Sequence, residues 1–336
     1  MKIFPDRTQL PLFLLRSTLL FGLLAMGGCF MMFMPGKSHQ GSLPLPTPEE
    51  ERIAQRLRAD VATLAGTIGE RNSLRYGQLQ QAAAYIGDSL RRMGYQVRGE
   101  SYLVGGKPVS NILVELPGSS RKDEIVLVGA HYDSVPDCPG ANDNASGVAA
   151  LLELARQFRE TRPGRTLRFV AFVNEEPPFF QTGLMGSRVH AVNARKRGEK
   201  IVAMLSLETI GYYSDAPGSQ HYPPPFSLFY PDSGNFIAFV GNLASRSLLH
   251  TAIKTFRDTT PFPSEGLAAP EFITGISWSD HWAFWQEGYP GIMITDTAPY
   301  RYPHYHEPTD TPDRLDYGRM ARVVAGVGRV VGEWVK

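Results

Sequence analysis

The amino-acid sequence predicts a three-layer α/β/α fold with a mixed, mostly parallel central sheet, preceded by one N-terminal transmembrane helix. Strand-like apolar runs alternate with segments of helical periodicity, and this order is typical of a sheet covered by helices on both faces. The 336 residues, of which 43% are hydrophobic and 20% charged, suffice for one large domain with a substantial core. An uncharged apolar stretch near the amino terminus predicts the additional helix.

That stretch runs from Ser17 to Met34 and contains no charged residue. As a helix it would be roughly 27 Å long, enough to cross the hydrocarbon layer of a bilayer. Lys2, Arg7 and Arg16 precede it and favour a cytoplasmic amino end, so the rest of the chain would be extracytoplasmic. A cleaved signal peptide and a lipoprotein processed at Cys29 are the alternative interpretations of this segment.

The chain therefore divides into a cytoplasmic tip with a membrane anchor (1–36), a proline-containing linker (37–48) and one large domain (49–336). Pro48 and the three glutamates after it mark the start of the first helix of this domain. Gly105 and Gly106 form a turn between the first two strands. The expected helices are 48–67, 76–93, 145–159, 186–197, 244–256, 281–287 and 319–334, and the expected strands are 101–104, 110–116, 125–128, 167–173, 201–207, 236–240 and 292–295.

Charge and cysteine content exclude some classes of function. The formal net charge is +1 and the lysines and arginines form no basic run, so the sequence offers no nucleic-acid interface. The two cysteines, Cys29 and Cys138, lie in the apolar segment and in a proline-flanked loop, and we expect them to be unpaired. The oligomeric state cannot be deduced from these features.

Acidic and imidazole side chains follow four of the expected strands. In open α/β sheets, sites are built at the carboxyl ends of strands, so we expect these groups to meet. They are His131, Asp133 and Asp143 after the strand at 125–128, Glu175 and Glu176 after 167–173, Glu208 after 201–207, and His306 after 292–295.

Together these side chains make a ligand set of nitrogen and oxygen atoms that suits zinc. His131, Asp143, Glu176, Glu208 and His306 supply five ligands, more than one catalytic zinc needs, so two ions bridged by one carboxylate fit the count. Glu175 is then free to act as general base toward a zinc-bound hydroxide, and Asp133 can orient the imidazole of His131.

An ordered series of motifs, covering roughly residues 116–317, resembles the co-catalytic zinc aminopeptidases of peptidase clan MH, which also contains glutaminyl cyclases and glutamate carboxypeptidases. The resemblance depends on HYDS (131–134), GANDNASG (140–147), NEE followed by GLMGS (183–187), SDH (279–281), GYPGIM (288–293) and HEPTDT (306–311). It implies that the large domain is a zinc peptidase domain. It also implies a peptide substrate with a free amino terminus.

Carried over residue by residue, the resemblance makes Asp143 the bridge between the two ions and Glu175 the base. His131 and His306 become terminal ligands, Glu176 a ligand of one ion and Glu208 of the other. His306 is preferred over His304 because it precedes the EPTDT string. The resemblance further implies a cis Asp143–Asn144 peptide bond.

Two departures from the family pattern concern substrate and metal. Relatives commonly have aspartate where Glu208 stands, so the longer side chain puts the second metal in doubt. The insertion PPFFQT (177–182) adds Phe179 and Phe180 near the site; together with Tyr212 and Tyr213 they suggest an apolar pocket, although packing explains such residues equally well. We therefore expect an uncharged residue, apolar rather than acidic, to be released. A glutaminyl cyclase-like acyltransferase and an inactive membrane-anchored ectodomain are the alternatives.

Overall fold

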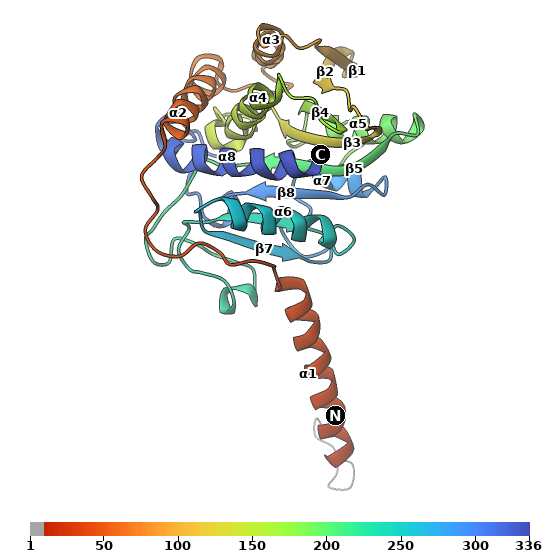
Figure 1. Cartoon of the computed structure of the whole chain (residues 1–336), viewed down its shortest axis with the longest axis vertical. Helices are drawn as coiled ribbons and strands as arrows, with labels where there is room; N and C mark the ends of the chain where they lie inside the picture. The colour runs from red at the N-terminus through yellow and green to blue at the C-terminus, as the bar shows by residue number, and fades with distance from the viewer. Residues whose placement is uncertain (1–9) are drawn as a thin grey trace.

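The structure, a computed structural model, describes residues 10–336 and contains one eight-stranded mixed sheet between two layers of helices (Figure 1). The strand order is β1-β2-β4-β3-β5-β8-β6-β7. The strands are β1 (Arg98–Val104), β2 (Lys107–Leu116), β3 (Arg121–His131), β4 (Arg165–Phe172), β5 (Lys200–Glu208), β6 (Ile237–Gly241), β7 (Ser264–Ala268) and β8 (Gly291–Thr295).

Four adjacent strands at the centre of the sheet run parallel. β3 pairs in parallel with both β4 and β5, and β5 pairs in parallel with β8. β6 is antiparallel to β8 and parallel to β7, and β1, β2 and β4 form an antiparallel series at the other edge. The carboxyl ends of β4, β3, β5 and β8 consequently lie along one side of the sheet, which is where the sequence predicts the site.

The helices divide between the two faces of the sheet. The apolar sides of α2, α3, α4, α6 and α8 pack on one face in the main core, whereas α5 and α7 pack on the other face against β3, β4 and β5. The helices are α1 (Leu10–Met32), α2 (Pro48–Val61), α3 (Tyr76–Arg92), α4 (Gly147–Phe158), α5 (Gly186–Lys196), α6 (Arg246–Thr259), α7 (His281–Trp285) and α8 (Tyr317–Trp334).

The expected three-layer fold is confirmed, and local chemistry explains where its elements begin. Thr47 caps α2 in a reciprocal capping box with Glu50, and Pro48 occupies the first turn. An irregular π-helical segment, Ala62–Ile68, follows α2, and a second one, Ala141–Ser146, precedes α4. β7 is not predicted by the sequence, because SEGLA is short and combines glutamate with glycine, neither of which favours strands.

The helix α1 projects away from the domain (Figure 1), and several of its large apolar side chains, including Leu19, Leu20 and Leu23, are exposed. At its carboxyl end, Met34 is buried against Gly266 of β7. Within residues 10–336, no helix has both the length and the apolar character needed to cross a membrane. The transmembrane helix expected from Ser17 to Met34 is thus not confirmed, and Lys2 and Arg7 lie outside the described residues.

Candidate metal centre

The central parallel strands bring the expected site residues together. His131 is the last residue of β3, Glu208 is the last residue of β5, and Glu175 and Glu176 lie in the turn just after β4. Asp143 belongs to the irregular turn before α4. His306 comes from the loop after β8.

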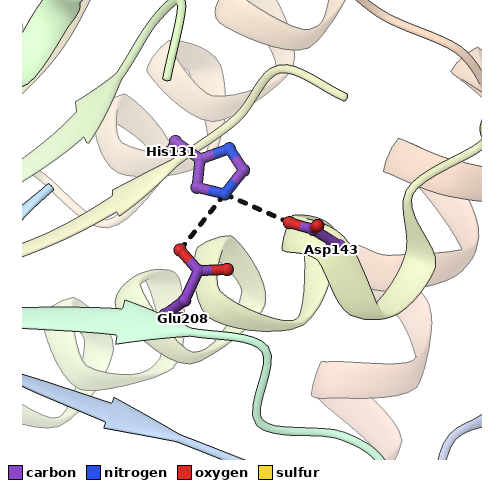
Figure 2. Close-up of side chains that lie close together, drawn as sticks. All are labelled: His131, Asp143 and Glu208. Carbon is purple, nitrogen blue, oxygen red and sulfur yellow. Dashed lines mark ion pairs between the residues drawn. The ribbon is translucent and has the colours of Figure 1, made fainter. Parts of the chain in front are cut away.

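Asp143 lies between the two imidazoles, with one carboxylate oxygen toward each. His131 Nε2 is 3.2 Å from Asp143 Oδ1 and 3.3 Å from Glu208 Oε2 (Figure 2). His306 Nε2 is 3.1 Å from Asp143 Oδ2 and 3.5 Å from Glu176 Oε2. Two three-residue groups that share Asp143 are thereby formed, and in each group the potential ligand atoms lie within 4.8 Å of one another.

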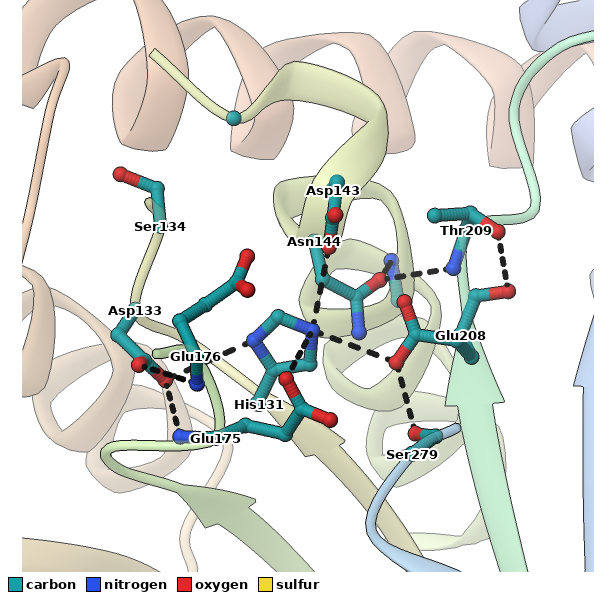
Figure 3. Close-up of polar contacts among 12 residues, drawn as sticks. His131, Asp133, Ser134, Asp143, Asn144, Glu175, Glu176, Glu208, Thr209 and Ser279 are labelled. Atoms are coloured by element: carbon teal, nitrogen blue, oxygen red, sulfur yellow. Dashed lines mark hydrogen bonds and ion pairs between the residues drawn. The ribbon is translucent and has the colours of Figure 1, made fainter. Parts of the chain in front are cut away.

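Glu175 is placed differently from these residues. Its Oε2 is 3.9 Å from His131 Nε2, and it belongs to neither of the two groups that share Asp143. It does form a third possible group with His131 and Glu176, so a ligand role for it is also geometrically open. Its carboxylate faces the same centre as the ligand candidates (Figure 3).

The turn that carries Asp143 is fixed by polar side chains from distant segments. Asp310 accepts hydrogen bonds from the backbone nitrogens of Asn142 (2.8 Å) and Asp143 (3.1 Å). The Asn144 side chain donates to Leu207 O and accepts from Thr209 N, which connects the turn to the end of β5 on either side of Glu208. The Asp143–Asn144 peptide is cis, as expected.

Close packing explains why the last residue of the GANDNASG motif, Gly147, is a glycine. A Cβ atom at this position would lie 2.4 Å from Asn144 Oδ1 and 2.5 Å from Leu207 O, so only glycine fits between the turn and β5. The helix α4 then begins at Gly147, directly after the turn that carries Asp143.

Asp133 and Ser279 fix neighbouring site residues through hydrogen bonds (Figure 3). Asp133 accepts hydrogen bonds from the backbone nitrogens of Glu175 and Glu176, both at 3.1 Å. Its Oδ1 is 3.5 Å from His131 Nδ1, so its shorter contacts are with this turn and not with the imidazole that we expected it to orient. Ser279 Oγ donates to Glu208 Oε2 at 2.7 Å.

Burial and mutual proximity shift the pKa values of these groups strongly. Burial, followed by neighbouring carboxylates, raises the pKa of both Glu175 and Glu176 well above 4.5. Burial opposes ionisation of Asp143 as well, but the close imidazoles of His131 (3.2 Å) and His306 (3.1 Å) outweigh it and lower the pKa of this carboxyl. Burial would lower the pKa of His131, yet the surrounding carboxylates raise it well above its usual value.

These residues fit a bound cation. Asp143 Oδ1, Glu176 Oε1 and His306 Nε2 are buried and have no hydrogen-bond partner within residues 10–336. Such atoms are costly unless a ligand satisfies them. No lysine or arginine of the described chain pairs with the carboxylates at the site. A mixture of imidazole and carboxylate without thiolate is the donor set expected for zinc.

His304, the alternative to His306, and His281 of the SDH motif are not among the potential ligands. His304 is partly exposed and its Nδ1 is 2.7 Å from Thr309 Oγ1, whereas His306 approaches Asp143 and Glu176. His281 is fully buried, and its Nε2 lies 2.8 Å from Ile276 O, so this residue has a structural role.

Three further residues near the centre escaped the sequence analysis. Asp280 is fully buried beside Ser279, and burial raises its pKa to about 7. Asp310 supports the turn, and the Tyr305 ring stacks on the His306 imidazole with the ring centroids 3.9 Å apart. Asp280 and Asp310 stand in the SDH and HEPTDT motifs, so the motif strings contained a signal for them, whereas Tyr305 had none.

A cavity of about 120 Å³ adjoins the centre, and Glu208 and Tyr305 form part of its wall. The other lining residues come from β6, β7, β8 and the loops around them, and most of them are apolar or aromatic. The four aromatic residues expected to form an apolar pocket do not line it: Phe179, Phe180, Tyr212 and Tyr213. Tyr213, for instance, is buried in the core, and its hydroxyl donates to Ile210 O.

Comparison with known proteins gives one family over most of the domain. The sequence profile of Peptidase family M28 matches residues 111–331. The uncharacterized protein YfbL of Escherichia coli (strain K12) is 39% identical over 292 residues, which cover 84% of this chain and 89% of that protein. The probable aminopeptidase YDR415C of Saccharomyces cerevisiae is 29% identical over 241 residues, covering 67% of this chain and 58% of the yeast protein.

Solved structures share the fold at low sequence identity. A zinc aminopeptidase from Bacillus subtilis superposes with a TM-score of 0.69 at 16% identity, covering 88% of this chain and 97% of that one. A glutaminyl cyclase from Porphyromonas gingivalis superposes with a TM-score of 0.62 at 20% identity, covering 84% and 98%. The architecture alone therefore does not distinguish hydrolysis from cyclisation.

Proposed function

Because the chain belongs to peptidase family M28 and is a metal-dependent peptidase by that membership, we propose that it is an aminopeptidase that binds two zinc ions. The observation that supports this most directly is the position of Asp143 between two imidazoles, with a separate carboxylate completing each group. A single ion would leave one of these groups unused.

The proposed ligands are His131, Asp143 and Glu208 for one ion and Asp143, Glu176 and His306 for the other. Zinc in these positions would polarise a peptide carbonyl and lower the pKa of a water molecule. The chain contributes the fixed geometry: Ser279 holds Glu208, and Asp310 and Asn144 hold the turn of Asp143.

Glu175 is the proposed general base. Its carboxylate faces the centre but stands farther from His131 than Asp143 and Glu208 do, at 3.9 Å against 3.2 and 3.3 Å. Burial raises the pKa of Glu175, and a raised pKa brings a carboxylate closer to the range in which it can both accept and return a proton near neutral pH. Glu175 would accept a proton from the attacking water and deliver it to the leaving amine.

The surplus of acidic side chains supports recognition of a free amino terminus. Glu175 and Glu208 both face the centre, and Glu208 also borders the cavity. A substrate ammonium group placed there would be neutralised by these carboxylates, whereas an acetylated amine would not be. The proposed reaction is release of a single amino-terminal residue.

Purified full-length chain should be tested with zinc on matched free and N-acetylated peptides. The proposal expects release of the amino-terminal residue from the free peptide and loss of cleavage after acetylation. Equal cleavage of both peptides rejects an aminopeptidase. Formation of pyroglutamate from a glutaminyl peptide without hydrolysis identifies a cyclase, and zinc binding without turnover of any substrate identifies an inactive ectodomain.

We also propose that α1 attaches the domain to a bilayer on the extracytoplasmic side. The exposed apolar residues of α1 and its projection from the domain support this (Figure 1). Two separate assays test this proposal: carbonate extraction of isolated membranes tests the anchor, and protease treatment of intact spheroplasts tests the orientation. Release of the protein by carbonate contradicts the anchor, and protection of the domain contradicts its orientation.

A further inference from the structure

One row of residues crosses the sheet from the metal centre to its edge. Glu208 on β5 is opposite Thr295 on β8, Thr295 is opposite Ala238 on β6, and Ala238 is opposite Glu265 on β7. Residues directly opposite each other on neighbouring strands project from the same face of a sheet. All four line the cavity beside the metal centre, so the row forms its floor, with a carboxylate at each end.

The wall between the two carboxylates is apolar. The rings of Tyr222 and Tyr230 are stacked, with centroids 5.6 Å apart, and both line the cavity together with Phe226. Their hydroxyls are used elsewhere, because Tyr222 donates to Pro231 O and Tyr230 donates to Gly266 O. The cavity therefore meets ring surfaces, which suit an aliphatic chain.

Glu265 lacks a close partner for its charge. No hydrogen bond to its carboxylate occurs in the described part of the chain, and its nearest cation, Arg257 Nη2, is 4.0 Å away. Arg257 is engaged with backbone oxygens instead, including Ser264 O at 2.7 Å and Pro35 O at 3.2 Å. The Glu265 side chain is only 25% exposed, and burial raises its pKa.

Gln220, a polar residue that also lines the cavity, already has hydrogen-bond partners. Gln220 Oε1 accepts hydrogen bonds from Arg301 Nε (2.7 Å) and Thr297 Oγ1 (3.1 Å), and Gln220 Nε2 donates to His221 O. Glu265 is thus the group in the cavity, away from the metal centre, that a cationic ligand would satisfy.

The length of the row matches a long basic side chain. Neighbouring strands are roughly 4.8 Å apart, so the Cα atoms of Glu208 and Glu265 are separated by roughly 14 Å. An extended lysyl side chain covers roughly 6 Å from Cα to Nζ, a charge-assisted hydrogen bond roughly 2.8 Å and the Glu265 side chain roughly 4 Å, which together make roughly 13 Å. A residue whose amine and carbonyl lie at the metal centre would therefore bring a terminal cation to Glu265, whereas a leucyl side chain would end short of it.

We propose that this cavity binds the side chain of the residue released, and that Glu265 selects lysine or arginine by pairing with its cation. This inference rests on the proposed aminopeptidase function and replaces the expectation of an uncharged residue. The aliphatic stem would lie against Tyr222, Tyr230 and Phe226, and the cation would reach the carboxylate beyond them.

Matched substrates isolate the charge from the size of the side chain. The zinc-loaded full chain should be assayed on lysyl and norleucyl anilides, and on arginyl and citrullinyl anilides. Each pair keeps the chain length and changes the charge. We expect kcat/KM to favour the cationic member of each pair by roughly 10-fold or more, as for a charge-assisted hydrogen bond in a partly buried site.

The variant Glu265→Gln should lower the lysyl-to-norleucyl and arginyl-to-citrullinyl ratios of kcat/KM to about one. Far-UV circular dichroism and the thermal unfolding midpoint, compared with wild type, show whether the variant is folded. Glu271→Gln is the matched control: Glu271 lies just after β7, is exposed and does not line the cavity, so it should retain the preference. An unchanged lysyl-to-norleucyl ratio in Glu265→Gln, or a wild type that favours the neutral member of each pair, overturns the inference and leaves the aminopeptidase proposal intact. Absence of cleavage for all four substrates overturns both.

Discussion

Replacement of Glu175 by glutamine distinguishes two possible roles of this residue, general base and metal ligand. The amide has nearly the same size as the carboxylate, and Glu175 contributes only its backbone nitrogen to the hydrogen bond with Asp133 Oδ1, so the turn should keep its shape. The amide cannot accept a proton from water. Because general-base catalysis contributes roughly 10²–10⁴-fold, we expect kcat to fall by that factor, equivalent to about 3–5 kcal/mol in activation free energy.

The geometry predicts that zinc stays bound in this variant. Both groups that share Asp143 are complete without Glu175, which stands 3.9 Å from His131 Nε2. The assay measures kcat, KM and zinc per chain on the same preparation of wild type and variant. Glu176→Gln provides the comparison, because Glu176 is a proposed ligand and its replacement should lower zinc content together with activity.

Two results would refute the reasoning about Glu175. A variant that keeps at least a third of the wild-type kcat shows that another group accepts the proton. A variant that loses zinc in proportion to activity shows that Glu175 is a ligand, as the third group of His131, Glu175 and Glu176 would allow.

Four further predictions follow from the contacts. Asp143→Ala should bind almost no zinc, whereas Glu208→Ala should bind one ion per chain. Equal zinc contents of the two variants in elemental analysis would contradict the role of Asp143 as a ligand shared by both ions. Burial raises the pKa of Glu100, but the contacts with His190, Asn111 and Asn193 together outweigh it and lower this pKa from 4.5 to about 2. Glu100→Gln should therefore lower the free energy of unfolding at pH 7 by about 2 kcal/mol after allowance for solvent screening. This contribution is present above pH 4.5 and is lost as the pH falls toward 2, so denaturant titrations of wild type and variant should converge in acid. The preference for lysyl over norleucyl substrates should shrink as the pH falls through the raised pKa of Glu265, and a ratio that is constant with pH would contradict this.

The sequence predicted the centre because its main residues follow strong local signals. His131 and Glu208 end long apolar strands, and the rule that sites form at the carboxyl ends of parallel strands applies without knowledge of side-chain packing. The preference for His306 over His304 required the motif order, because both stand in one loop and periodicity does not separate them. In the structure His306 has a φ of 60°, a local conformation that no spacing rule predicts.

Residues that act through tertiary contacts could not be predicted in the same way. Ser279 is 71 positions from Glu208 along the chain, and its hydrogen bond depends on how α7 packs against β5. Glu265 lies on β7, which was not recognised as a strand, so its register with Ala238 was unknown. The four aromatic residues that were expected to line an apolar pocket do not line the cavity. Closeness in sequence to Glu176 and Glu208 does not determine whether a ring reaches the cavity.

Under the proposed function, Glu208 takes part in both metal binding and side-chain selection. The extra methylene of glutamate, compared with the aspartate that the family resemblance implies at this position, adds a rotatable bond whose entropy must be lost when a ligand oxygen is fixed. Ser279 Oγ restrains that freedom by donating to Glu208 Oε2, and Ser279 Oγ is itself 2.8 Å from Ser206 Oγ on the same strand as Glu208. The restrained oxygen is the one that lies 3.3 Å from His131 Nε2. Glu208 also begins the row of paired residues that ends at Glu265. Under the proposed function, the residue that binds one ion therefore also borders the cavity for the substrate side chain.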